Sequence, residues 1–146
     1  MVKKILVPLD GSPLAEAILP QVTELTTPLR AEVPLLRVAL VHVFPGVDRM
    51  EGEVQVIHEA EAYLAALAGK LAGEGIHVRT AVRYGKAAEE ILAHIAANEV
   101  DLVAMSTHGR SGLSRLVMGS VAEEVVRNAG VPVLLVRASG KSAEHK

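Results

Sequence analysis

The stretch from Ser106 to Ser120, STHGRSGLSRLVMGS, has residue types suited to holding phosphate groups. In it, Gly109 and Gly119 bracket nine residues, and small hydroxylated side chains stand at both ends. Glycine-rich turns and the backbone amides at the start of a helix attract anions, and Gly119 allows the backbone to approach a ligand closely. The spacing is neither that of a Walker loop nor that of a dinucleotide fingerprint. It therefore indicates an anion site without naming the ligand.

The same segment also has a purely structural interpretation, and so does Asp10 near the start of the chain. The segment Ser120–Glu123 reads SVAE, a capping box in which the serine caps the helix and the glutamate reaches back. Asp10 stands in the turn sequence DGSP, where turn preference alone favours it, although a carboxylate also accepts two hydroxyl hydrogen bonds well. A capping hydroxyl yields to a phosphate oxygen, so both interpretations stay open.

An acid–base–nucleophile set of Asp10, His108 and Ser120 is the enzymatic alternative, and the sequence disfavours it. The G-x-S-x-G turn that exposes a nucleophilic serine is absent. His58 and His94 have no histidine four residues away, so the helical spacing of metal ligands is absent as well. The sequence predicts no catalytic residue and no metal ligand from the protein.

Short β-branched runs alternate with longer segments of helical periodicity along the chain. The predicted strands are Ile5–Leu9, Leu35–Phe44, Ile76–Tyr84, Asp101–Met105 and Val131–Val136. The predicted helices are Leu14–Thr26, which Pro20 should kink or split, segments around 56–71 and 91–95, and Val121–Ala129. Residues 27–34 are predicted to form an irregular connection. This alternation requires a parallel, doubly wound α/β sheet with right-handed crossovers.

The positions of the predicted strands in the sheet follow from their polarity. We expect the third strand near an edge because one of its faces is polar, and the fifth at an edge because Pro132 disfavours a central position. The fourth strand is continuously apolar after its first residue and should be central, covered on both faces. Ligands of such sheets bind beyond the carboxyl ends of the strands, where the strand order reverses. The turns after the first, second and fourth strands are therefore the predicted site.

Composition limits the classes of function. The chain has 146 residues, 50% of them apolar, which suits one packed domain. Aromatic residues make up 2% and the formal charge is −2, so neither a base-stacking platform nor a basic field for nucleic acid is present. Cysteine is absent, which excludes disulfides and thiolate chemistry. The first apolar run is too short for a signal peptide, and no run approaches the ~18 residues of a membrane span, so we expect a cytoplasmic protein.

Three segments carry a resemblance to a known family: KKILVPLDGS, LVHVF, and VDLVAMSTHGRSGLSRLVMGSVAEEVVRNAGVPVLLVR. Along nearly its whole length the sequence resembles the universal stress protein family. The nucleotide-binding branch of that family shows Gly, two residues, Gly, nine residues, then Gly-Ser or Gly-Thr. Gly109 and Gly119-Ser120 match this motif, and Ser106 occupies the position of its first glycine. The resemblance implies a single-domain, five-stranded Rossmann-like fold of strand order 3-2-1-4-5 over residues 1–137, with a tail at 138–146.

The resemblance also implies a ligand, ATP. From the phosphate loop together with Asp10, we predict that Mg²⁺ or Mn²⁺ bridges its phosphates. Carried over by position, Asp10 binds the ribose hydroxyls, the backbone of Pro8 and Leu9 lines the site, and Val43 holds the adenine edge through its main chain. The residues placed around the phosphates are Ser106, Thr107, His108, Gly109, Gly119, Ser120 and Val121. Apart from the resemblance, Arg110 and Arg115 lie within the loop and would add positive charge there, with simple solvation as the alternative for a lone basic residue.

The predicted function is that of an ATP-binding stress-response regulatory protein with slow or no turnover. A slow ATP hydrolase and a nucleotide-free dimeric interaction protein are the open alternatives. The last strand, Val131–Val136, is an apolar edge that nothing later in the chain covers, so we expect a homodimer that pairs this strand with its copy. A helix of the same chain overhanging this edge is the alternative to the dimer.

Overall fold

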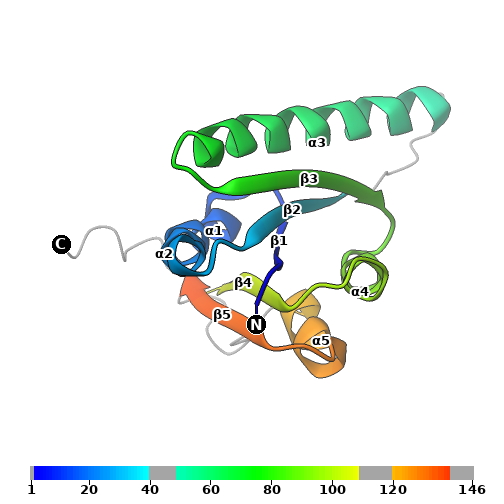
Figure 1. The fold of residues 1–146 in the computed structure, drawn as a ribbon. Coiled ribbons are helices and arrows are strands. Elements are labelled where there is room, and N and C mark those ends of the chain that lie inside the picture. Colours follow the sequence, from blue (N-terminus) through cyan, green and yellow to red (C-terminus); the bar gives the residue numbers. More distant parts are fainter. Residues whose placement is uncertain (1, 40–48, 109–119, 139–146) are drawn as a thin grey trace.

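The computed structural model describes residues 2–39, 49–108 and 120–138, which form a five-stranded parallel sheet between helices (Figure 1). The strand order is β3-β2-β1-β4-β5, so the predicted fold class and strand order are confirmed. Both strands predicted at edges lie there, and the fourth lies between two neighbours. The strands are β1 (Ile5–Leu9), β2 (Glu32–Ala39), β3 (His77–Tyr84), β4 (Leu102–His108) and β5 (Val133–Ala138).

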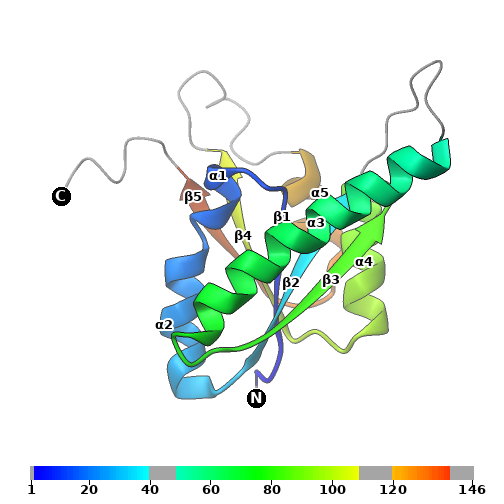
Figure 2. The same ribbon diagram turned by 90° about the horizontal axis from the view of Figure 1, so that it is seen from above.

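Helices cover both faces of the sheet, as the view from above shows (Figure 2). The helices are α1 (Pro13–Glu16), α2 (Leu19–Leu29), α3 (Arg49–Ala72), α4 (Ala87–Ala97) and α5 (Ser120–Asn128). One core packs α2 and α3 against the sheet, and the other packs α4 and α5 against its opposite face. No helix among the described residues is long and apolar enough to cross a membrane.

The central strand β1 divides its side chains between the two cores. Ile5, Val7 and Leu9 belong to the core under α2 and α3, whereas Leu6 belongs to the core under α4 and α5. All five residues of β1 are buried. This pattern explains why the run is apolar without alternation, as is typical of a parallel strand covered on both faces.

The predicted break at Pro20 is confirmed, because α1 ends at Glu16 and α2 begins at Leu19. Proline has no backbone N–H and is tolerated in a first helical turn, where that donor has no intrahelical partner. The irregular connection predicted for residues 27–34 is wrong. Helix α2 continues through Pro28 to Leu29, and β2 already begins at Glu32. Pro28 lies in the last turn of α2, so it does not stop that helix.

The end of β4 also differs from the prediction in a way that matters for the site. The strand was expected to end at Met105, but it runs on to His108. Ser106 and Thr107 are therefore strand residues, in register with Val136 and Arg137 of β5, and not loop residues. Backbone pairing with β5 extends the strand beyond its apolar part. The boundary predicted between residues 137 and 138 stays a prediction, since residues 139–146 lie outside the described ranges.

Candidate functional site

A pocket of about 220 Å³ lies where the strand order reverses, at the carboxyl ends of β1 and β4. From β1 the chain goes to β2 on one side, while β4 pairs with β1 on the other. Divergence of the connections at such a point leaves a crevice, which is where parallel α/β sheets bind ligands. The pocket therefore lies where the sequence predicts the site.

Seven of the predicted site residues line this pocket. Among the others, the side chain of His108 and four whole residues lie outside the described part of the structure. Those four are Val43, Gly109, Arg110 and Gly119. The structure thus brings together the first and fourth strands and the start of α5, and the ligand role of each residue stays a prediction. The seven lining residues are Pro8, Leu9, Asp10, Ser106, Thr107, Ser120 and Val121.

The rest of the wall is formed by apolar residues that were not predicted as site residues. They come from β2, α4, β4, α5 and α1, which are far apart in the sequence. The first turn of α4 carried a usable signal, because Ala87 and Ile91 are four residues apart just after the third strand, at the carboxyl edge of the sheet. These further lining residues are Ala15, Leu36, Val38, Ala87, Ile91, Met105 and Ala122.

Asp10 sits in a turn at the rim of the pocket. Its Oδ1 accepts a hydrogen bond from the backbone N–H of Ser12 at 2.9 Å, which is an Asx turn. Gly11 makes this turn with a φ of +89°, in the left-handed region that glycine adopts without strain. Asp10 is therefore a turn residue, as its local sequence indicates. The same turn sets its exposed carboxylate at the pocket.

Ser12 is the cap of α1, and the helix is bonded to β4. The Oγ of Ser12 accepts from the backbone N–H of Ala15 at 3.1 Å, as expected for an N-cap serine followed by proline. The Oγ of Ser106 in β4 donates to the carbonyl oxygen of Ala15 at 3.2 Å. The short helix that follows the Asp10 turn is thus held to the strand that forms the other side of the site.

At the third side of the pocket, Ser120 is the first residue of α5 and is exposed. The carboxylate of Glu123, predicted to complete a capping box, accepts from Arg127 at 3.1 Å. Helix α5 points its N-terminus into the carboxyl-end crevice, where the partial positive charge of a helix dipole favours an anion. No group of three or more acidic or histidine side chains among the described residues is arranged to hold a metal ion.

Fold and site together define a doubly wound α/β protein with a pocket at its switch point. The profile of the Universal stress protein family matches residues 1–137. The chain is 36% identical over 140 residues to universal stress protein MJ0531 of Methanocaldococcus jannaschii, covering 92% of this chain and 82% of that one. The chain belongs to the universal stress protein family.

Solved structures agree with this assignment. The structure of protein MJ0577 of Methanocaldococcus jannaschii superposes with a TM-score of 0.82 at 32% identity, covering 96% of this chain and 99% of that one. A family member from Arabidopsis thaliana, solved with AMP bound, has a TM-score of 0.71 at 16% identity, over 95% of this chain and 94% of that one. At that identity the second likeness concerns the fold alone.

Proposed function

We propose that this protein binds ATP in the switch-point pocket and acts as a regulatory member of its family. The observation that carries the proposal is the division of the pocket into two chemically different walls. Val38 of β2 and Ile91 of α4 offer an apolar surface, whereas Asp10, directly after β1, and Thr107 of β4 bring oxygen atoms. A base needs the first surface and a sugar phosphate the second. The AMP held by the Arabidopsis relative supports an adenine nucleotide as the ligand class.

In this proposal the base lies against the apolar wall, with Val43 holding its edge, and Asp10 accepts hydrogen bonds from the ribose hydroxyls. The backbone of Pro8 and Leu9 lines the ribose. The phosphates extend toward the N-terminus of α5, where exposed amides and the helix dipole favour negative charge. Mg²⁺ or Mn²⁺ would be held chiefly by phosphate oxygens, which suits a site without a metal-binding cluster of side chains among its described residues. We expect Gly109, Gly119 and Ser120 to surround the phosphates, with Arg110 beside them; of these four, Ser120 is the one within the described residues.

Titration calorimetry with ATP and Mg²⁺ tests the proposal. We expect saturable binding by the wild type and a roughly ten- to hundredfold weaker affinity for Asp10→Ala, the scale of hydrogen bonds to a charged group. Glu61→Ala, which removes an exposed carboxylate on α3, is the matched control and should bind like the wild type. Absence of binding at millimolar ATP by the wild type would refute the function, and unchanged binding by Asp10→Ala would refute the assigned pocket.

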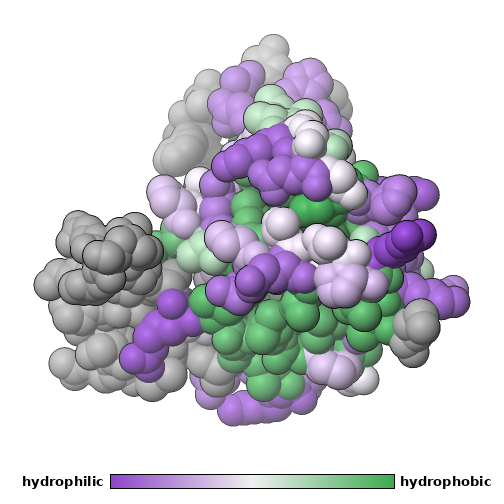
Figure 3. Space-filling model, turned by 60° about the vertical axis from the view of Figure 1, so that its left-hand side comes forward, coloured by the Kyte–Doolittle hydropathy of each residue, from purple (hydrophilic) through white to green (hydrophobic). Residues whose placement is uncertain are grey.

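We further infer that two copies of the chain pair through β5. Its residues Val133–Val136 are all apolar. Because β5 is an edge strand, all four are only partly buried. Figure 3 brings the side of α2 and β5 forward and shows a hydrophobic area low on this side. Edge strands of this kind are normally covered, and a second copy across a two-fold axis is the simplest cover.

A further inference from the structure

The hydroxyl of Ser106 is used inside the protein, which its place in the family motif does not suggest. In the motif this position is the first glycine, which has no side chain. Here the Oγ of Ser106 crosses from β4 to α1 and donates to the carbonyl oxygen of Ala15 at 3.2 Å, between residues 91 positions apart. The serine therefore adds a contact between two elements of the site that a glycine would lack.

The helix that receives this hydrogen bond is too short to hold itself in place. Helix α1 has four residues, and a single turn of helix is marginal without outside contacts. On the side of α3, the hydroxyl of Tyr63 donates to Oε2 of Glu16 at 2.6 Å. Burial and then the Glu16 carboxylate raise the pKa of Tyr63 above its ordinary value, so this donor keeps its proton. Side chains from β4 and from α3 thus anchor α1.

A chain of three hydrogen bonds leads from Ser106 to the carboxylate at the pocket. Ser106 Oγ donates to the Ala15 carbonyl at 3.2 Å, the Ala15 N–H donates to Ser12 Oγ at 3.1 Å, and the Ser12 N–H donates to Asp10 Oδ1 at 2.9 Å. Each link fixes the residue that makes the next one. A small cavity of about 50 Å³ between α1 and β4 is lined by all four residues, so α1 has room to shift when the first link is lost.

We propose that Ser106 is a positioning residue that sets the Asp10 carboxylate for the ribose hydroxyls of the bound nucleotide. The proposal rests on the proposed function and changes the role expected for Ser106, which was contact with the phosphates. Ser106 acts through α1, because its hydroxyl proton is committed to the Ala15 carbonyl. A site held in its binding geometry before the ligand arrives loses less conformational entropy on binding.

The test compares Ser106→Ala, Ser106→Thr and the wild type by calorimetry with ATP and Mg²⁺. Ser106→Ala removes only the hydroxyl and should weaken ATP binding about three- to tenfold, the effect of one neutral hydrogen bond. Ser106→Thr keeps the hydroxyl on a residue that strands favour, and should restore wild-type affinity. Thr80→Ala, which removes an exposed hydroxyl from β3, is the control and should have no effect.

Two further measurements separate positioning from a general loss of structure. In an Asp10→Ala background, Ser106→Ala should cause no additional loss, because the residue it positions is gone. The affinity ratio of ATP to 2′,3′-dideoxy-ATP, which reports the ribose contact, should fall in Ser106→Ala. Equal losses in both backgrounds, an unchanged ratio, or wild-type affinity of Ser106→Ala would each overturn the proposal. Failure of the wild type to bind ATP would instead overturn the proposed function, and the positioning role with it.

Discussion

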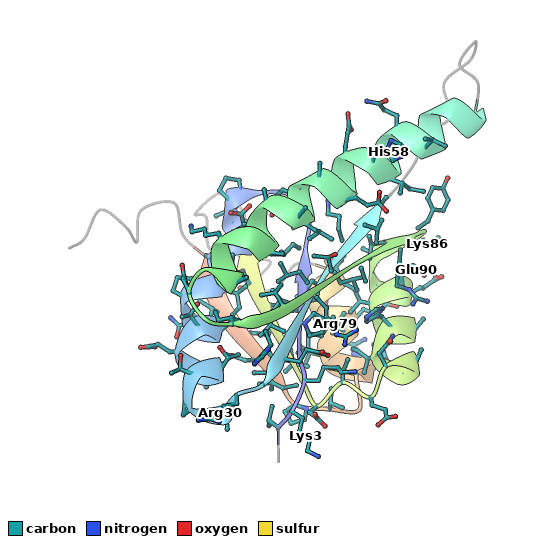
Figure 4. The ribbon with its side chains drawn as sticks, turned by 45° about the horizontal axis from the view of Figure 1, so that its top comes forward. Lys3, Arg30, His58, Arg79, Lys86 and Glu90 are labelled. Atoms are coloured by element: carbon teal, nitrogen blue, oxygen red, sulfur yellow. The ribbon has the colours of Figure 1, made fainter. Side chains whose placement is uncertain are left out.

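The edge strands β3 and β5 present opposite chemistry to their surroundings. Strand β3 carries Arg79, which pairs with Glu32 of β2, and Arg83, which pairs with Glu90 of α4 at 3.0 Å. Figure 4 shows Arg79 on β3 and Glu90 on α4. Strand β5 presents only apolar side chains over Val133–Val136. The β3 edge of the sheet therefore carries long charged side chains, whereas residues Val133–Val136 at the β5 edge carry none.

The difference indicates which edge is closed and which is open to a partner. Charged residues on an edge strand oppose pairing with another chain, because pairing would bury their charges. In β3 the two arginines also belong to ion pairs with neighbouring elements, and the half-buried pair of Arg83 with Glu90 stabilises the monomer more than the exposed pair of Arg79 with Glu32. In β5 the apolar side chains gain from being covered. We therefore expect association through β5 and none through β3.

The largest effect should come from giving β5 the character of β3. Leu134→Lys places a charge in the proposed dimer contact, and should raise the dimer dissociation constant at least about a hundredfold, because an unpaired charge is costly to bury. Light scattering should report about twice the chain mass of 15.4 kDa for the wild type and the chain mass for the variant.

The matched control places the same charge on the other edge. Thr80→Lys changes an exposed residue of β3 and should leave the mass of the dimer unchanged. A wild type that is monomeric at micromolar concentration would refute the proposed dimer and, with it, the expected difference between the β3 and β5 edges. Leu134 also contacts the core under α2 and α3. If the melting temperature of Leu134→Lys is much lower than that of the wild type, loss of packing within the chain, and not loss of the dimer contact, explains its lower mass.

The sequence predicted the elements better than their ends, and the two kinds of error have different causes. The apolar run of β1 and the break near Pro20 follow from local rules, and both were predicted. The continuation of α2 through Pro28 and of β4 to His108 depends on packing and on pairing with β5. Such contacts override local preference, and a single sequence does not reveal them.

At the site, the polar residues were predicted together with Pro8, Leu9 and Val121, but most of the apolar wall was not. Asp10 and Ser120 stand next to turn and cap signals, which draw attention to them in the sequence. Leu36 and Ile91 look like ordinary core residues, because nothing local tells a pocket wall from a packed interior. The hydrogen bond from Ser106 to Ala15 joins residues 91 positions apart and depends on how α1 folds back on β4. Its discovery required the structure.

A smaller effect is expected from removing the ion pair of β3 with α4. Arg83→Met should lower the free energy of unfolding by about 1–2 kcal/mol, because Arg83 bonds Glu90 and also contacts Nδ1 of His94 at 3.4 Å in a part-buried position. Urea unfolding measures the change. Arg127→Met breaks a pair of similar length whose arginine is 72% exposed, and should cost under about 0.5 kcal/mol. Equal costs for the two variants would mean that the β3 network adds nothing beyond a surface pair.

The smallest effect is a dependence of stability on pH that we expect from His94, on the β3 side of the sheet. His94 of α4 is buried, and it contacts Arg83, whose guanidinium has donors only, so Nδ1 accepts and the ring is neutral. Burial first, and then the charges of Arg83 and Lys4, lower the pKa of His94. Two acidic groups lie nearby, and both carboxylates are already paired: Glu90 with Arg83, and Glu32, which lines a cavity together with His94, with Arg79.

The sign of the pH effect follows from this lowered pKa. Below about pH 6.5, the ordinary pKa of histidine, the unfolded chain binds a proton that the folded chain resists. The stability contribution of neutral His94 is therefore complete above that pH and declines as the pH falls toward the folded pKa. Urea unfolding at about pH 7.5 and pH 5.5 should show a smaller decline for His94→Gln, which keeps an acceptor for Arg83 but does not titrate. Because the proposed contact through β5 is apolar, the proposed dimer should not share this pH dependence. An equal decline in wild type and His94→Gln would assign the acid sensitivity to other groups.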